Sequence, residues 1–151
     1  MQDRARGVVI DQEGDVYVGG TTWGDVDGNS SAGMEDVVLA KFSGDGSKYW
    51  TRQYGAEYSD EFRGIAVDSR DRIYISGQTG HVLENVEILL MRVDADGEME
   101  LNEAFGTEEH DDGQAIAVDG SDHVYIVGGT YGALDGEHAG VADLFVMRVC
   151  E

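Results

Sequence analysis

Oxygen-bearing side chains recur at alternate positions in the segment 23–31, which reads Trp-Gly-Asp-Val-Asp-Gly-Asn-Ser-Ser. A carboxylate farther along the chain completes a spacing of 1, 3, 5 and 12. Ca²⁺ takes about 6 to 8 hard oxygen ligands, which a loop of this kind can supply. The sequence therefore offers a candidate calcium site made by Asp25, Asp27, Asn29 and Asp36.

This candidate calcium loop departs from the EF-hand pattern in one respect. The EF-hand needs glycine at position 6, whereas Gly28 stands here at position 4 and Ser30 at position 6. The corresponding segments 80–85 and 134–139 hold little of the motif. A solvated turn rich in Asp, Asn and Gly explains the same residues, so both interpretations stay open.

Other polar and aromatic side chains could contact a ligand. An aromatic ring can stack on a sugar, while carboxylates and imidazoles can hydrogen-bond a polar partner. The alternatives are packing against a neighbouring loop and ordinary surface exposure, and the histidines show no His-x-x-x-His metal spacing. The candidates for a ligand surface are Trp23, Asp60, His110, Asp111, Tyr131 and His138.

Two sets of aspartates recur along the chain. The first set suits an Asx-type turn, in which a carboxylate accepts backbone N–H bonds, with a functional ring of carboxylates as the alternative. The second set would make a surface negative, which could attract cations or a basic partner or only keep the protein in solution. The first set is Asp11, Asp68 and Asp119, and the second is Asp3, Asp60 and Asp111.

Cations also recur, since Lys41, Arg92 and Arg148 end three equivalent apolar runs. Because 31 acidic residues surround only 10 basic ones, we expect these three to form structural ion pairs. The single cysteine, Cys150, excludes an internal disulfide. Enzyme motifs such as a Gly-x-Ser-x-Gly elbow, a phosphate loop or a dinucleotide fingerprint are absent from the sequence.

All these residues belong to a repeat that covers nearly the whole chain. An apolar run ending in aspartate occurs at 6–11, 63–68 and 114–119, and each leads to a second run with a matching tyrosine. Further runs follow at 36–42, 87–93 and 143–149, and a fourth segment at 48–54 and 99–105. Short segments rich in β-branched and aromatic residues, separated by Gly, Asp and Ser turns, predict an all-β fold.

The third run of each repeat is apolar on both faces, as Val37 with Leu39 and Val38 with Ala40 illustrate. Such a strand needs a sheet covered on both sides. A four-stranded unit of roughly 40 to 50 residues in tandem is typical of a β-propeller blade. We therefore predict one partial β-propeller domain over 1–151, with blades at about 6–55, 63–106 and 114–149, the last without its outer strand.

The repeat resembles the bacterial seven-bladed β-propeller repeat family. Segments 64–79, 143–148 and 50–55 carry the resemblance, with Ile for Val and Arg for Lys. It implies a propeller fold and a secreted or surface-associated protein whose molecular function is poorly defined. The segment 1–6 precedes no apolar stretch, so we expect no secretory signal in this chain.

Three blades cannot close a ring, since propellers have about 4 to 8. We expect closure either by oligomerisation, with a six-bladed homodimer preferred, or by a longer parent chain. Propeller topology would place the ligand candidates on one face, with the first set of aspartates on the opposite face.

The formal charge of −21 limits the partners. It argues against nucleic acid, and no run of roughly 18 apolar residues suits membrane insertion. We therefore predict a non-enzymatic, acidic binding or scaffold module that presents a surface to a protein or glycan, stabilised by Ca²⁺ if the candidate calcium loop closes on the ion. The alternative is a hydrolase or lyase with its site at the loop face of the assembled propeller, because propeller enzymes assemble sites from scattered loops.

Overall fold

The computed structural model describes residues 2–81, 85–134, 136 and 140–150. In this part of the chain it has eleven strands and no helix, and hence no helix that could cross a membrane. The strands are β1 (Asp3–Ile10), β2 (Val16–Thr22), β3 (Asp36–Phe42), β4 (Lys48–Tyr54), β5 (Ser59–Val67), β6 (Ile73–Gly80), β7 (Val86–Val93), β8 (Met99–Phe105), β9 (Asp111–Val118), β10 (Val124–Thr130) and β11 (Asp143–Val149).

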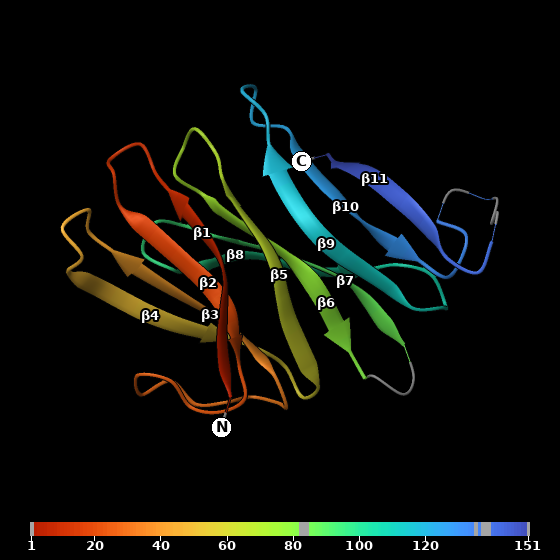
Figure 1. Cartoon of the computed structure of the whole chain (residues 1–151), viewed down its shortest axis with the longest axis horizontal. Helices are drawn as coiled ribbons and strands as arrows, with labels where there is room; N and C mark the ends of the chain where they lie inside the picture. The colour runs from red at the N-terminus through yellow and green to blue at the C-terminus, as the bar shows by residue number, and fades with distance from the viewer. Residues whose placement is uncertain (1, 82–84, 135, 137–139, 151) are drawn as a thin grey trace.

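The strands form three antiparallel sheets that lie side by side (Figure 1). Blade 1 has the order β1-β2-β3-β4, blade 2 the order β5-β6-β7-β8, and blade 3 the order β9-β10-β11. Sequential order within each sheet is the meander of a propeller blade. The all-β, partial-propeller prediction is therefore confirmed, as an open stack of three blades.

Each inner strand starts earlier than the apolar pattern indicated, at Asp3, Ser59 and Asp111. The added residues are polar, but they pair with the end of the second strand, as Asp60 does with Thr79. A β-bulge separates this polar part from the apolar part in all three blades. The bulge shifts the register, so that both the polar and the apolar part of one inner strand pair with the second strand of the blade.

Two apolar layers hold the blades together. Tyr17 and Leu39 of blade 1 pack against Phe62, Ile75 and Met91 of blade 2, all of them almost fully buried. A second layer joins Tyr74, Ile88 and Leu90 of blade 2 to Val124 and Ile126 of blade 3. The sheet of blade 2 is thus covered on both faces, which is why β7 has apolar residues at both parities.

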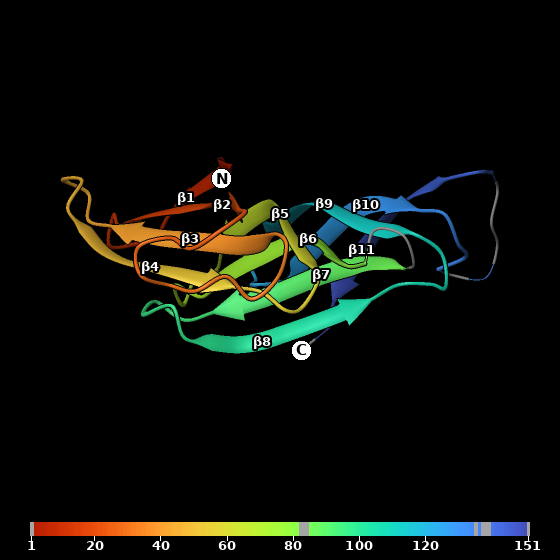
Figure 2. The ribbon, with the colours of Figure 1, turned by 90° about the horizontal axis from the view of Figure 1, so that it is seen from below.

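The connections fall on two opposite faces, as antiparallel pairing requires. The loop face comprises 23–35, 55–58, the described part of 81–85, 106–110 and the described part of 131–142. The turn face comprises 11–15, 43–47, 68–72, 94–98 and 119–123. Three of these turns stand along the upper edge in Figure 1, and Figure 2 views the molecule from the side of the loop face.

Candidate functional site

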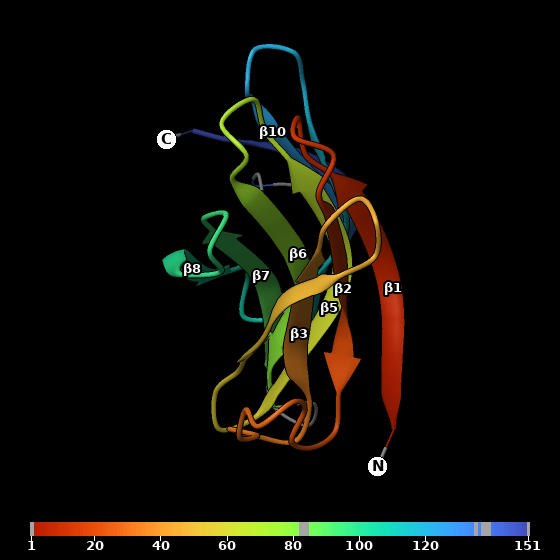
Figure 3. The ribbon, with the colours of Figure 1, turned by 90° about the vertical axis from the view of Figure 1, so that its left-hand side faces the viewer.

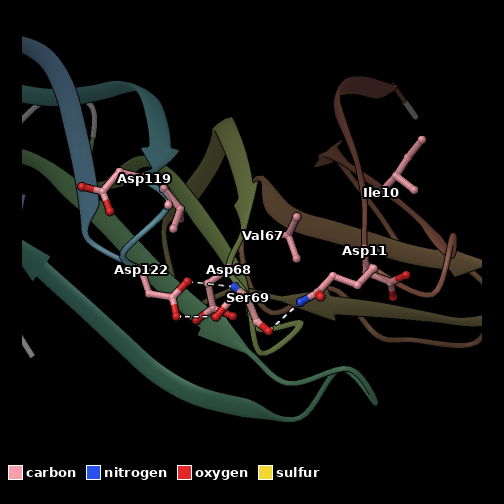
Figure 4. Close-up of a pocket in the computed structure, with 10 residues that line it drawn as sticks. Ile10, Asp11, Val67, Asp68, Ser69, Asp119 and Asp122 are labelled. Carbon is pink, nitrogen blue, oxygen red and sulfur yellow. Dashed lines mark hydrogen bonds between the residues drawn. The ribbon is translucent and has the colours of Figure 1, made fainter.

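All three blades contribute to a cavity of about 390 Å³ on the turn face (Figure 4). Each blade supplies the last apolar residue of its inner strand and the aspartate that follows it. The cavity is lined by Ile10, Asp11, Gln12, Val67, Asp68, Ser69, Val118, Asp119, Gly120 and Asp122.

The first set of aspartates forms the expected Asx-type turns. Asp68 Oδ1 accepts the backbone N–H of Arg70 at 2.9 Å and that of Arg72 at 3.0 Å. Asp11 and Asp119 repeat both bonds with the residues two and four positions on. One oxygen of each carboxylate is thereby committed to closing its own turn.

The second carboxylate oxygen faces a basic side chain in all three turns, since Asp11 Oδ2 lies 3.8 Å from Lys41 Nζ. Asp68 Oδ2 lies 2.6 Å from Arg72 Nε, and Asp119 Oδ2 lies 2.9 Å from His123 Nδ1. The hydrogen bonds from the His123 backbone and ring, and from the Ser121 backbone, lower the pKa of Asp119 to about 2. Asp119 is therefore ionised at neutral pH and has no proton to give as a general acid.

Neighbouring turns are also hydrogen-bonded to each other across the blades. Ser69 donates its N–H to Asp122 Oδ1 at 2.9 Å and its hydroxyl to Asp122 Oδ2 at 2.5 Å, as Figure 4 shows. Gln12 donates its N–H to Asp71 Oδ1 at 3.2 Å, in the equivalent place one blade earlier. Gln12, Ser69 and Asp122 of this cavity therefore link blade to blade.

The loop face carries three exposed aromatic side chains: Trp23 is 52 %, Tyr58 44 % and Tyr131 49 % exposed. Two of the rings have imidazole neighbours. His110 and Tyr131 meet edge to face with centroids 5.8 Å apart, and Tyr58 and His81 do the same at 5.3 Å.

The structure thus brings the candidates His110 and Tyr131 together, while His138 lies outside the described residues. The Tyr58–His81 pair was not foreseen from the sequence. The available signal was position, because Tyr58 and His81 stand in the same two connections of the repeat as His110 and Tyr131.

Asp60 and Asp111 do not lie in the connection, as the sequence suggested, but within β5 and β9, where they are 3 % and 0 % exposed. Asp60 accepts the N–H of Ala56 and the hydroxyl of Thr79, both at 2.6 Å. Asp111 accepts the N–H and the hydroxyl of Thr107. Both carboxylates are thus buried and close the turn that precedes each inner strand, and their part in a ligand surface stays a prediction. Asp3, in contrast, is exposed and accepts the Thr22 hydroxyl at 2.6 Å.

The four residues of the candidate calcium loop make separate contacts. Asp25 accepts the N–H of Ser31 at 2.8 Å, Asp27 lies 2.5 Å from Lys48 Nζ, and the buried Asp36 accepts the Gln53 amide at 2.6 Å. Asn29 donates to the Val26 carbonyl at 2.9 Å. Among the described residues, no group of three or more His, Cys, Asp or Glu side chains is placed to hold a metal ion.

Two of the three recurring cations form the expected ion pairs. Lys41 Nζ lies 3.1 Å from Asp15 and 3.8 Å from Asp11, and Arg92 Nε lies 2.9 Å from Glu100. Burial opposes the charge of Lys41, but the adjacent Tyr17 side chain and Asp15 carboxylate outweigh it and raise the pKa of Lys41. Arg148 and Cys150, at the end of blade 3, are exposed.

Fold and site together define a protein built from β-propeller blades. The family described as beta-propeller repeat matches residues 2–26 and 50–84, which include β1, β2 and the joint between blades 1 and 2. These two segments therefore match the repeat of this family, as the sequence resemblance indicated. Among curated proteins, no match to the chain is found.

Proposed function

We propose that this chain is a non-enzymatic binding or scaffold module whose loop face holds a protein or glycan ligand. The observation that carries the proposal is the group of exposed rings, Trp23, Tyr58 and Tyr131, contributed by different connections of the same face. Loops on a rigid scaffold are the usual place for binding residues.

The chemistry of the loop face suits a ligand with apolar faces and polar edges. Aromatic rings supply large contact area at low conformational cost, and their edges and polar tips leave hydrogen bonds available. His81 and His110 contact Tyr58 and Tyr131 edge to face, which restricts the orientation of the two phenol rings. A pre-oriented ring loses less entropy when a sugar ring or a side chain stacks on it.

Two carboxylates of the turn-face cavity are unsuited to general acid catalysis, while a hydrolase or lyase site on the loop face stays the alternative. A general acid at neutral pH needs a raised carboxyl pKa. Hydrogen bonds from Ser69 lower the pKa of Asp122, and those from His123 and Ser121 lower the pKa of Asp119. Both groups line the cavity as acceptors.

Calcium binding by Asp25, Asp27, Asn29 and Asp36 stays a prediction of the sequence. In this structure Asp27 Oδ2 accepts from Lys48 and Thr51, and Asp36 Oδ2 accepts from Gln53, while Asp36 Oδ1 is buried without a hydrogen-bond partner. We propose the loop face as a binding surface that works without a bound ion.

A panel of neutral glycans and basic proteins, screened with the 151-residue chain, tests the proposal. We expect a ligand whose affinity falls at least tenfold in Tyr131→Ala and in Trp23→Ala. Tyr49→Ala is the matched control, because Tyr49 is 58 % exposed but lies on the outer strand β4. The loop-face assignment would be overturned if Tyr49→Ala lost as much affinity as the loop-face variants. It would also be overturned if Tyr131→Ala and Trp23→Ala bound every ligand with the affinity of the wild type.

A further inference from the structure

The two ends of the blade stack expose faces that are buried between blades elsewhere in the molecule. At the trailing end, which is the outward face of β9, β10 and β11, Leu144 is 84 % and Val146 68 % exposed. The equivalent residues of blade 2, Ile88 and Leu90, are 0 % and 1 % exposed. The trailing end therefore exposes the kind of apolar face that the next blade covers in blade 2.

The leading end, which is the outward face of β1, β2 and β3 and faces the viewer in Figure 3, is the reciprocal surface. Val8 and Ile10 are 62 % and 61 % exposed, whereas the equivalent Ile65 and Val67 pack into the core between blades 1 and 2. Grooves of about 390 Å³ and 490 Å³ lie on the leading and trailing ends. Contiguous apolar surface of this kind marks an interaction site.

We propose that the trailing end of one copy docks onto the leading end of a second copy, and that the same contact repeated once closes a six-bladed ring. Rings of propeller blades hold about 4 to 8 blades, and two copies of the three described blades give six. Such a contact is heterologous and closes when the rotation returns to the start.

Charge at the two ends supports a second copy as the occupant. Between blades 1 and 2, Arg6 Nη2 on the bulge of β1 lies 2.8 Å from Glu61 Oε1 on β5. In the same positions, the trailing end presents Gln114 and the leading end presents Arg4, both exposed. Gln114 therefore stands where blade 1 has Arg6, and Arg4 stands where blade 2 has Glu61. Like charges are avoided, and the amide oxygen can accept from Arg4.

Side-chain size is matched in the same way. Phe62 of blade 2 fills space above Gly7 and Gly19 of blade 1, where an added Cβ would meet the ring at 2.9 Å and 2.2 Å. At the trailing end the equivalent residues are the larger Ala115 and Val127. The leading end presents the small Ala5 in the place of Phe62. A residue of phenylalanine size would collide there, and alanine fits.

The turn face adds no such match. The link between turns uses the backbone N–H at the second turn position, Gln12 or Ser69, and an aspartate at the fourth position of the next turn, Asp71 or Asp122. At the open ends these positions hold Gly120 and Gly14, so the N–H is kept and the carboxylate is absent. Docking therefore buries no unpaired carboxylate at this position.

The formal charge of −21 on each copy opposes the docking. Because salt screens this repulsion while apolar burial persists, the affinity between copies should rise with ionic strength.

Sedimentation equilibrium of the 151-residue chain at micromolar concentration tests the proposal. We expect twice the mass of one 16.3 kDa chain, with a dissociation constant that falls as salt is added. Leu144→Glu should raise that constant at least tenfold. Val141→Glu, at an equally exposed valine outside the trailing groove, should leave it unchanged. A monomer at every salt concentration, open chains of more than two copies, or a dimer unaffected by Leu144→Glu would each overturn the proposal.

A charge exchange tests the register of the contact. Gln114→Arg should weaken the dimer at least tenfold, because it places two arginines together across the junction. Adding Arg4→Glu should restore the dimer, because it recreates the pair seen between Arg6 and Glu61. If the dimer joined two trailing ends instead, Arg4→Glu would rescue nothing, and the head-to-tail arrangement would be refuted.

Discussion

The junction between blades 1 and 2 depends on a residue that has no side chain. A Cβ placed on Gly19 would lie 2.2 Å from Phe62 Cε2 and 2.6 Å from Phe62 Cζ. Carbon atoms in contact prefer roughly 3.5 to 4.0 Å, so Gly19→Ala forces the ring to withdraw by more than an ångström. Phe62 is fully buried among the side chains of both blades and has little room to move.

The cost of Gly19→Ala follows from this geometry. Overpacking a well-filled core destabilises by about 1 to 3 kcal/mol, and truncating a fully buried phenylalanine, as in Phe62→Ala, costs about 3 to 5 kcal/mol. In the double variant the added methyl enters the space that the ring leaves. We therefore expect the double variant to be less destabilised than the sum of the two single variants, by about 1 to 2 kcal/mol.

Urea unfolding followed by tryptophan fluorescence measures the four free energies of this double-mutant cycle. Gly140→Ala is the control, because the nearest atom to its added Cβ is 3.9 Å away, and it should change stability by less than about 0.5 kcal/mol. A neutral Gly19→Ala, or two effects that simply add, would refute the close packing of Phe62 on Gly19.

Three further outcomes can be checked by thermal and chemical melts. Asp68→Asn should cost about 2 to 3 kcal/mol, because it removes the carboxylate that pairs with the half-buried Arg72, whereas Asp119→Asn at the exposed equivalent turn should lower the melting midpoint by clearly less. Folding lowers the pKa of Asp119 from 3.8 to about 2, so the stabilisation by its carboxylate is present above pH 4 and is lost as the pH falls through 2. The difference in melting midpoint between the wild type and Asp119→Asn should therefore vanish over that range. A difference that stays constant would contradict this expectation. Because Asp27 is held by Lys48, the midpoint should be equal in Ca²⁺ and in chelator, and a rise in Ca²⁺ would restore the calcium prediction.

Much of the fold could be predicted because its signals are local. Matching apolar runs gave the strands and their order, and the aspartate after each inner strand gave the Asx-type turn, as at Asp68. The early start of the inner strands was missed, because polar residues such as Asp60 carry no strand pattern of their own. Their partner, Thr79, lies on another strand, and only the pairing identifies them.

The candidate site was predictable only in part for the same reason. The loop-face connections and Tyr131 follow from the repeat, but the contact of Tyr58 with His81 joins residues from different connections. The candidate calcium loop had ligand-type residues at suitable spacing. In the folded chain, Lys48 and Gln53 of β4 each contact one carboxylate oxygen, that of Asp27 and that of Asp36, which only the tertiary structure brings about.

One repeated position shows what the chain alone determines and what its neighbours decide. Tyr17, Tyr74 and Tyr125 occupy identical places in β2, β6 and β10, and the sequence assigned all three to the same strand position. Tyr17 and Tyr74 are 0 % and 1 % exposed, whereas Tyr125 is only partly buried. Local pattern sets the strand and the side on which a residue stands, since backbone geometry alternates side chains. Burial requires a further blade against that side, and this is a property of the assembled stack.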